Sequence, residues 1–396
     1  MPKKTIEDID VGSKKVLLRV DFNVPLNRDT GDISDDTRIR ASLPTIKHLI
    51  DHRAKVIVCS HLGRPKGKVV EGLRMSPIAE RLSQLMGLPV ATASDCVGPE
   101  AERKAGALKE GDILVLENLR FHPEEEQNDG GFAQKLASLA DIYVNDAFGT
   151  AHRSHASTVG VAKYLPAVAG FLMDKELRVM EKLLHDPERP WGCIVGGAKV
   201  SDKIGLLQNM LKKVDTLLVG GGMAATFLKA QGYEVGHSLV EDDKLDLARK
   251  LLQEANEWKV PFLLPVDVVV AEEIKAGVST RVVSTTEIPV GSHIVDIGPS
   301  SIALFQDELE KCRTIMWNGP VGIYEIPQFA QGTGAIASFI STLGATTVIG
   351  GGSSAEVVQE MGLADKMTHV STGGGATLRF LEGATLPGVE VLLDTE

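Results

Sequence analysis

In the first half of the chain, side chains that can bind anions follow directly after four short apolar segments. The four motifs read RVDFNVP, CSHLGRP, LENLRF and NDAFGTAHRSHAST. They supply Asp21, Asn23, His61, Arg64, Arg120, His152, Arg153 and His155, and Arg38 lies in the helix expected after the first motif. Arginine suits bidentate capture of carboxylate and phosphate groups, and four arginines close together would repel one another without an anion. These residues predict a pocket for a small, multiply anionic molecule.

Each of these residues also has a simpler interpretation. A single arginine is usually a solvated surface residue, and His61 taken alone is a loop histidine. His152 and His155 have the H-x-x-H spacing of a metal site, but Arg153 between them disfavours a cation and no third ligand is evident. The repetition after four segments favours the anion pocket over coincidence and over a metal.

The second half of the chain has glycine-rich loops in the corresponding places. The loops read GGAKVSDK, VGGGMAATF, IGGGSSAEVV and STGGGATLRF, each between an apolar segment and a helical pattern. Glycine lets backbone amides approach an oxyanion, and a helix N-terminus adds partial positive charge. One such loop can simply allow tight packing between a strand and a helix. Four of them favour a nucleotide or another polyphosphate.

Two lysines follow the first glycine loop. Lys199 and Lys203 are expected in the first turn of a helix, where the helix dipole disfavours cations. Their spacing of four would let both point from one helix face. A bound phosphate would make this placement favourable, whereas the simpler interpretation is two exposed lysines.

The elements that must position these residues alternate between strand and helix. Short runs such as KVLLRVD and AKVIVCS are nearly continuous in apolar residues, as strands buried on both faces are. The segment 36–50 has apolar residues at helical spacing, and Asp36 can cap it. The alternation predicts an α/β fold with mainly parallel sheets. Because parallel strands present their carboxyl ends at one sheet edge, the loops described above are expected to form the binding sites.

Composition excludes several classes of protein. The 396 residues carry a formal net charge of −11, which argues against broad nucleic-acid or membrane binding. The four cysteines, at positions 59, 96, 193 and 312, are far apart, so the sequence predicts neither a zinc pair nor a CxxC motif. We expect reduced thiols and a cytoplasmic location. The beginning, MPKKTIEDID, has no apolar region of a signal peptide, and no apolar run has the length of a membrane span.

Eight motifs together closely resemble the phosphoglycerate kinase family. They are RVDFNVP, SHLGRP, LENLRF, NDAFGTAHRSHAS, VGGAKVSDK, GGGMAATFLKA, MWNGPVGIYE and STGGGATLRFLEG, in the family's order, and the similarity extends from about residue 15 to about residue 390. The resemblance implies two doubly wound domains with mainly parallel sheets, joined by a helix and flanking a cleft. It implies a 3-phosphoglycerate-binding domain in 1–170 with the tail 380–396, a connecting helix in 171–185 and a nucleotide-binding domain in 186–379.

The resemblance also implies which residues act. Substrate binding is expected at Asp21, Phe22, Asn23, Arg38, His61, Leu62, Gly63, Arg64, Arg120 and Arg153. Nucleotide binding is expected at Lys203, Gly221, Asn318, Glu325, Gly351, Gly352, Ser353, Ser354, Gly373 and Gly374. Arg38 and Lys199 are the implied catalytic residues, on the transferred phosphoryl group. The substrates would be 3-phosphoglycerate or 1,3-bisphosphoglycerate with ATP or ADP, and we expect a monomer with no nucleic-acid or membrane partner.

One position departs from the family. Where the family commonly has an aspartate after the glycines, this chain has Ser353. A serine hydroxyl can bind phosphate but brings no charge. Mg²⁺ keeps several waters and depends on substrate phosphates, so we expect it to be bound mainly through the nucleotide, with no protein metal ligand.

The implied reaction explains the absence of a Ser-His-Asp set among these residues. The acceptor is a carboxylate that carries no proton near pH 7, so no general base is required. Catalysis then depends on positioning and on neutralising the charge of the moving phosphoryl group. In-line transfer would follow closure of the two domains, which excludes water.

Two other functions remain open at this point. Gly220-x-Gly222-x-x-Ala225 and Gly350-x-Gly352-x-x-Ala355 loosely match a dinucleotide fingerprint, which suggests a nicotinamide-dependent dehydrogenase, but the acidic ribose partner is not clear. A two-domain anion-binding protein of the periplasmic kind is the non-enzyme alternative. It would need a signal peptide and would have no use for four nucleotide-type loops.

Overall fold

The structure is a computed structural model that describes residues 2–27 and 30–395. The chain divides into two compact units. Unit 1 comprises Met1–Arg178 and Thr385–Glu396, and unit 2 comprises Val179–Ala384. The division falls within a helix, α6 (Phe171–His185), at the place where the sequence predicts the connecting helix.

Unit 1 contains a six-stranded sheet in the order β3-β4-β2-β1-β5-β6, and its neighbouring strands all pair in parallel. The strands are β1 (Lys15–Arg19), β2 (Lys55–Cys59), β3 (Val90–Thr92), β4 (Ile113–Val115), β5 (Ile142–Asn145) and β6 (Ala167–Ala169). Residues of β1, β2, β4 and β5 are almost all buried, as the continuous apolar runs predict. The doubly wound prediction for this half is confirmed.

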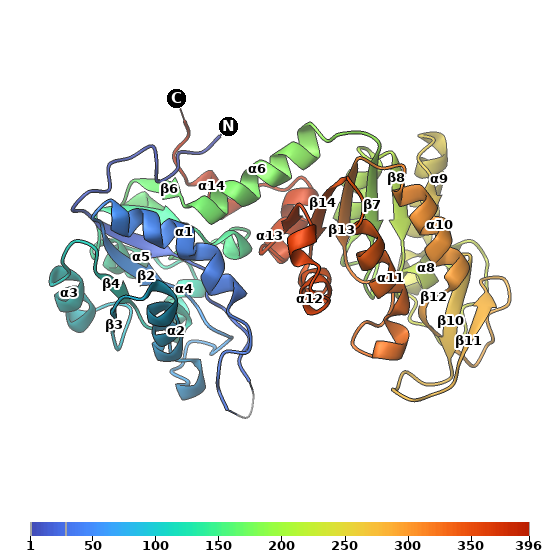
Figure 1. Cartoon of the computed structure of the whole chain (residues 1–396), viewed down its shortest axis with the longest axis horizontal. Helices are drawn as coiled ribbons and strands as arrows, with labels where there is room; N and C mark the ends of the chain where they lie inside the picture. Colours follow the sequence, from blue (N-terminus) through green and yellow to red (C-terminus); the bar gives the residue numbers. More distant parts are fainter. Residues whose placement is uncertain (1, 28–29, 396) are drawn as a thin grey trace. The chain divides into compact units, whose positions relative to one another are not determined.

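The helices of unit 1 pack around this sheet (Figure 1). They are α1 (Thr37–Asp51), α2 (Ser76–Met86), α3 (Pro99–Gly106), α4 (Pro123–Glu126), α5 (Gly130–Ala137) and α14 (Pro387–Glu390), with 3-10 helices η1 (Glu71–Leu73), η2 (Leu119–Phe121), η3 (Phe148–Thr150) and η4 (Gly160–Lys163). Both ends of the chain belong to this unit, where Lys3 forms an ion pair with Asp394 at 2.9 Å. The terminal segment is thereby fastened beside the beginning of the chain.

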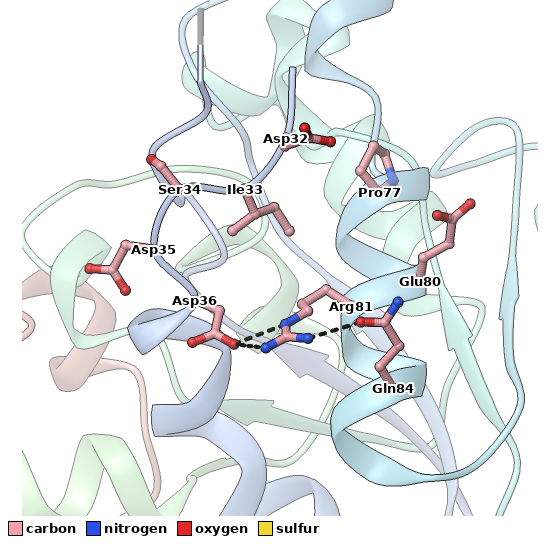
Figure 2. A pocket seen from close by; sticks show the side chains of 9 residues that line it. All are labelled: Asp32, Ile33, Ser34, Asp35, Asp36, Pro77, Glu80, Arg81 and Gln84. Atoms are coloured by element: carbon pink, nitrogen blue, oxygen red, sulfur yellow. Dashed lines mark hydrogen bonds and ion pairs between the residues drawn. The ribbon is translucent and has the colours of Figure 1, made fainter. Parts of the chain in front are cut away.

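Helix α1 begins one residue after Asp36, but Asp36 does not cap it through its side chain. Its carboxylate accepts instead from Arg40 Nε at 2.7 Å, and from Arg81 Nε and Nη2 at 2.9 and 2.7 Å. Figure 2 shows the bridge from Asp36 to Arg81 on α2, beside a pocket of about 510 Å³. The predicted cap is wrong because two guanidinium groups compete for the carboxylate more strongly than a backbone amide does. The bridge fixes the beginning of α1, the helix that carries Arg38, to α2.

Helix α6 begins at the end of the sheet of unit 1. Asp146, which follows β5, accepts from the backbone amides of Leu172 and Met173 at 2.8 and 3.2 Å. The buried carboxyl thus satisfies two amides of the first helical turn that have no partner within the helix. The start of α6 is therefore set by unit 1.

Unit 2 contains a second six-stranded parallel sheet, in the order β15-β14-β13-β7-β8-β9. Its strands are β7 (Trp191–Val195), β8 (Thr216–Val219), β9 (Phe262–Leu263), β13 (Thr314–Asn318), β14 (Thr346–Gly350) and β15 (His369–Val370). Its helices are α7 (Ile204–Leu211), α8 (Met223–Ala230), α9 (Leu245–Glu257), α10 (Pro299–Leu309), α11 (Gln331–Ile340), α12 (Gly352–Glu360) and α13 (Gly375–Leu381), with 3-10 helices η5 (Asp242–Lys244), η6 (Pro327–Phe329) and η7 (Ala364–Lys366).

The alternating pattern does not predict a third sheet, which is small and antiparallel. It has the order β11-β10-β12, from β10 (Asp267–Ala271), β11 (Thr280–Ser284) and β12 (His293–Ile297). The run PFLLPVDVVV, which reads as one strand, is divided between β9 and β10. Pro265, which lies between the two strands, explains this break, because proline cannot donate a ladder hydrogen bond. Both main sheets remain parallel, as predicted.

Candidate active-site residues in the two units

The anion-binding motifs of unit 1 follow β1, β2, β4 and β5. In the order of the sheet these are four consecutive strands, β4-β2-β1-β5. All pairs among them are parallel, so their carboxyl ends lie at the same edge. The sheet therefore brings the loops of the four separate motifs to one edge, as the sequence predicts.

Arg38 and Asp21 form an ion pair at this edge. Arg38 Nη1 lies 2.5 Å from Asp21 Oδ2, and the Arg38 side chain is about one third exposed. Burial alone would raise the pKa of Asp21, but neighbouring cations, Arg38 first, hold it below its usual value. Asp21 thus keeps its charge and orients a guanidinium whose remaining donors are available to an anion.

His61 is 4 % exposed and lies against a buried arginine. Its Nδ1 is 3.3 Å from Nη2 of Arg19 and 3.9 Å from Oδ1 of Asp21. Burial, together with the charges of Arg19, Arg120 and Arg38, lowers the pKa of His61 well below its ordinary value. Since arginine can only donate, Nδ1 accepts, and the neutral ring carries its hydrogen on Nε2. His61 is therefore a hydrogen-bond donor at Nε2.

Backbone and side-chain hydrogen bonds connect the loops after β1, β2 and β4. The Gly63 amide donates to Asn23 Oδ1 at 2.8 Å, and Arg120 Nη1 donates to the Gly63 carbonyl at 2.9 Å. The Leu62 amide donates to Asn118 Oδ1 at 3.2 Å, and Phe22 is fully buried. Phe22, Leu62 and Gly63 thus act here as the support of the loops, and the peptide groups around Gly63 hold Asn23 and Arg120 together.

The guanidinium groups in this region influence one another. Burial lowers the pKa of Arg120, and the charge of Arg153 contributes to the same shift. Arg153 is partly exposed and donates from Nε to His152 Nε2 at 3.2 Å, while Arg64 is exposed. An anion beside Arg120 would oppose the effect of the neighbouring positive charge. The electrostatics thus support the anion pocket.

A buried polar network, which the sequence analysis missed, supports these residues. Arg19 Nε donates to Ser157 Oγ at 2.9 Å, and that hydroxyl donates to Glu125 Oε1 at 2.6 Å. Arg19, Ser157 and Glu125 are each fully buried. The signal was an arginine inside the apolar run KVLLR, because a charge in a buried strand requires a partner.

The metal interpretation of His152 and His155 finds no support in the described ranges 2–27 and 30–395. Neither histidine belongs to a group of three or more potential metal ligands there. His155 Nδ1 lies 3.8 Å from Glu125 Oε1, and burial lowers the pKa of His155 to about 4. His155 therefore borders the Arg19 network as a neutral ring.

In unit 2, Lys203 and Asn318 join the first glycine loop to β13. Lys203 Nζ donates to Asn318 Oδ1, and burial lowers the pKa of Lys203. The expected helical placement of both lysines is wrong, because α7 begins only at Ile204, with Lys203 at its N-cap and Lys199 exposed in the preceding loop. In the segment before α7, the Ser201 amide donates to the Glu241 side chain at 3.0 Å, which is a partner outside the helix. Lys199 is thus free of helical constraint.

The loop IGGGSSAEVV connects β14 directly to α12. Gly351 has a φ of 88°, which favours glycine, and a Cβ there would lie 3.4 Å from Asn318 Nδ2. Ser354 is fully buried, and its hydroxyl accepts from the Gly319 amide at 2.7 Å. Ser353 is partly exposed in the first turn of α12. The loop thus presents its backbone and Ser353 outward while Ser354 ties it to β13.

A cavity of about 300 Å³ lies beside the glycine loops that follow β7 and β8, entirely within unit 2. Glycine and aliphatic residues form most of its wall, and the predicted nucleotide residues Gly221 and Glu325 are among those that line it. A Cβ on Gly221, whose φ is 71°, would lie 2.8 Å from the Gly197 amide nitrogen. The cavity has the size and apolar character of a small-ligand site. Gly373 and Gly374 belong to a separate loop, between β15 and α13.

Asp296 also lines this cavity, and it predicts a pH dependence of stability. Burial raises the pKa of Asp296 from 3.8 to about 7, although the Gly332 and Ile297 amides donate to its oxygens. Between these two values the folded protein holds a proton that the unfolded chain has released. Stability is therefore expected to fall as pH rises through this window, by at most about 1.4 kcal/mol per pH unit.

The measurement is urea unfolding of wild type and of Asp296→Asn between about pH 5 and about pH 8. The wild-type stability should decline relative to the variant up to about pH 7 and then stay level. Parallel pH profiles would show that Asp296 does not titrate in this range.

Comparisons with known proteins all lead to one family. The family model described as phosphoglycerate kinase matches residues 6–384. Phosphoglycerate kinases of Pelotomaculum thermopropionicum and Moorella thermoacetica are each 57 % identical over 394 residues, and that of Dictyoglomus turgidum is 58 % identical over 398; all of each chain is covered. Among solved structures, phosphoglycerate kinase from Coxiella burnetii matches with a TM-score of 0.88 at 40 % identity, and that from Pyrococcus horikoshii with 0.85 at 34 %, each covering 98 % of both chains.

Proposed function

The chain belongs to the phosphoglycerate kinase family, and from this premise we propose how its residues divide the work of the reaction. The enzyme is a phosphotransferase with a carboxyl acceptor, and it moves a phosphoryl group reversibly between 1,3-bisphosphoglycerate and ADP. The observation that carries the residue assignment is the cationic edge of the parallel sheet in unit 1. This cationic edge favours neither a nicotinamide-dependent dehydrogenase nor an anion-binding protein of the periplasmic kind.

Unit 1 binds the phosphoglycerate. His61, Arg64, Arg120 and Arg153 hold the 3-phosphate, where Nε2 of His61 donates. Asn23 and Asp21 contact the glycerate part, and Asp21 also aims Arg38. The mutual repulsion of Arg120 and Arg153 supports this assignment, since a phosphate between them relieves it.

Unit 2 binds the nucleotide. The base would occupy the cavity lined by Gly221, with Glu325 toward the ribose, and the phosphates would follow the loops at Lys203 and Gly351–Gly352. The Asn318 Nδ2 atom is buried without a hydrogen-bond partner among the described residues, and it faces the Gly350–Gly351 backbone. An unused buried donor in such a loop is suited to an anionic oxygen. Gly352, Ser353, Ser354, Gly373 and Gly374 complete the predicted set.

Positioning and charge neutralisation then perform the transfer. The attacking carboxylate needs no base. Arg38 and Lys199 neutralise the negative charge of the phosphoryl group in the transition state. Since Arg38 belongs to unit 1 and Lys199 to unit 2, both can act on one group only after the units close. Closure also excludes water, which would otherwise accept the phosphoryl group.

Magnesium is the cofactor expected with the nucleotide. The donors that this chain offers at Gly351–Ser354 are hydroxyls and backbone amides, which are neutral, so they fit an ion that nucleotide phosphates carry. Bound magnesium would supply charge neutralisation at the phosphates. No step of the transfer depends on a protein carboxylate at that loop.

Replacing Ser353 with aspartate tests this assignment. The Ser353→Asp variant is expected to bind Mg-ADP roughly five- to tenfold more tightly, because a carboxylate in the first turn of α12 can reach the metal, and tenfold equals about 1.4 kcal/mol. Isothermal titration calorimetry with Mg-ADP and with ADP in chelator measures the difference. Ser353→Asn is the matched neutral control, and an equal affinity in wild type and Ser353→Asp contradicts the proposal.

The activity itself is tested in a coupled assay. Purified protein receives 3-phosphoglycerate, magnesium and ATP, and NADH loss is followed through added glyceraldehyde-3-phosphate dehydrogenase. Saturable activity that requires 3-phosphoglycerate is the expected result. Folded protein that turns over no 3-phosphoglycerate, or that oxidises NADH without the added dehydrogenase, overturns the function.

We further propose a cytoplasmic monomer. The four cysteines are free and buried, which suits a reducing compartment, and the net charge of −11 disfavours nucleic acid. Within the described ranges, no helix is long and apolar enough to cross a membrane.

A further inference from the structure

Three potential metal ligands meet in unit 1, and none of them is one of the predicted substrate residues. Asp95 and Cys96 lie in the loop between β3 and α3, and His122 follows η2. One ligand atom of each residue lies within 4.8 Å of the others. This is the one group of three or more His, Cys, Asp or Glu ligands so placed in the part of the chain that the structure describes.

Hydrogen bonds join the Asp95 carboxylate to the His122 ring and to the backbone of Cys96. Asp95 Oδ1 lies 2.7 Å from His122 Nε2, and it accepts from the Cys96 amide at 2.6 Å. Bond lengths of about 2.0 to 2.3 Å put the ligand atoms of tetrahedral zinc roughly 3.3 to 3.8 Å apart. A small outward shift of the Asp95 and His122 side chains would therefore admit a metal ion in place of the shared proton.

The chemistry of the donors selects the class of metal. A thiolate, an imidazole and a carboxylate suit zinc and neighbouring transition metals, whereas magnesium and calcium require oxygen ligands. Three protein ligands leave a fourth position for water. The set is therefore unsuited to the magnesium that accompanies the nucleotide.

The surroundings combine a fixed, buried thiol with an open side. Cys96 is fully buried, whereas the side chains of His122 and Asp95 are 28 % and 47 % exposed. The Phe132 ring lies 5.1 Å from the His122 ring and limits its rotation. A metal ion can thus enter from solvent on the Asp95 side and reach a sulfur that solvent does not.

Binding has a defined proton balance. An ordinary cysteine thiol, with a pKa of about 8.5, carries its proton near pH 7. A divalent ion binds the thiolate and displaces that proton to solvent, and no electron is transferred. The nearby carboxylates favour the cation once it is bound.

We propose that Asp95, Cys96 and His122 form a binding site for a single Zn²⁺ or similar transition-metal ion, with water as the fourth ligand. The site is additional to the kinase reaction and does not depend on the assignment of the substrate residues. It joins the loop after β3 to the segment that follows η2. Occupancy is expected to raise the thermal midpoint, because the metal binds only the folded arrangement.

The test uses the full chain, stripped of metal and titrated with Co²⁺ and with Zn²⁺. The expected results are one equivalent bound, a sulfur-to-cobalt charge-transfer band, and release of a proton. Zn²⁺ affinity, measured against a chromophoric chelator, should fall at least about a hundredfold in Cys96→Ser and tenfold or more in His122→Gln. Cys312→Ser, which removes a buried thiol in unit 2, is the matched control and should bind like wild type.

The outcomes separate folding from binding. Each variant is first compared with wild type by circular dichroism and thermal midpoint without metal. If Cys96→Ser is misfolded, Asp95→Asn, which changes a half-exposed side chain, replaces it and should still weaken Zn²⁺ binding. No bound metal in wild type, a charge-transfer band that persists without Cys96, or wild-type affinity in Asp95→Asn and His122→Gln overturns the proposal.

Discussion

Replacing Arg38 with alanine is expected to lower kcat about a thousandfold while changing the KM for 3-phosphoglycerate less than about tenfold. An arginine that meets the charge of a phosphoryl group in transfer is worth about 10³ to 10⁵ in kcat. In the proposed assignment, other groups hold the ground-state substrate, His61 and Arg120 among them. A residue that acts mainly in the transition state therefore lowers kcat and kcat/KM together.

The structure supplies a control on the same helix. Arg40 lies two residues further along α1, is exposed, and pairs with Asp36 at 2.7 Å. Arg40→Ala removes a guanidinium of the same kind from a partner outside the proposed site, so kcat should remain within about twofold of wild type, as exposed ion pairs contribute little. Equal losses in the two variants would show that α1 is merely damaged.

A second variant separates charge from shape. Arg38→Lys keeps the cation but loses the planar fork that Asp21 orients at 2.5 Å. Its kcat should lie between those of wild type and Arg38→Ala. If Arg38→Ala instead raises KM with kcat unchanged, Arg38 serves ground-state binding, and the proposed role is wrong.

The positions of the loops that we propose to bind the anion could be predicted because they depend on local sequence and on one rule of topology. Motifs such as RVDFNVP and CSHLGRP follow buried runs, and parallel strands bring the ends of such runs to one edge. The strand order was not needed for that inference. The sequence pattern therefore predicts which loops share an edge of the sheet, but it does not predict the order of the strands.

Competition between partners explains what local reasoning missed. Asp36 stands at the N-cap of α1, yet its carboxylate binds Arg81, which lies 45 residues away in sequence. Lys199 lies outside α7, in a segment where the Ser201 amide donates to the side chain of Glu241, 40 residues away in sequence. Each error concerns a side chain or a helix end that can either follow the local helix pattern or bind a partner distant in sequence. Tertiary contacts decide between the two.

Sites whose residues come from distant parts of the chain cannot be predicted from the spacing of residues in the sequence. Asp95 and His122 are 27 residues apart, and the wide scatter of cysteines suggests that no metal site exists. The fold brings them together because β3 and β4 pair in parallel, so the segments that follow both strands lie at the same edge of the sheet. Arg19 has the same character, since its partners Ser157 and Glu125 come from elements far along the chain.

Arg19 therefore leads to the largest expected effect on stability. The Arg19→Met variant is expected to lose about 3 to 5 kcal/mol of unfolding free energy, the cost of leaving a buried charge without its partner. Glu125 is fully buried, and burial already raises its pKa while Arg19 and the Ser157 hydrogen bonds oppose that shift. Methionine fills much of the volume, so the loss reports charge rather than a cavity. Urea unfolding measures it.

The matched surface control is Arg178→Met. Arg178 is exposed and pairs with Asp174 at 2.8 Å, one turn away on α6. Such exposed pairs contribute about 0.3 to 0.5 kcal/mol. A loss in Arg19→Met no larger than in Arg178→Met would show that Glu125 has another source of compensation.

A double-mutant cycle with Glu125→Gln then isolates the coupling. Glutamine carries no charge and can still accept from Ser157 Oγ, as Glu125 Oε1 does at 2.6 Å. The variant with both changes should be clearly more stable than the sum of the two single losses predicts, because neither charge is then buried alone. Additive losses would mean that Arg19 and Glu125 are stabilised independently. In that case the hydrogen bond from Arg19 to His61, rather than the charge balance with Glu125, would explain why an arginine occupies the end of a buried strand.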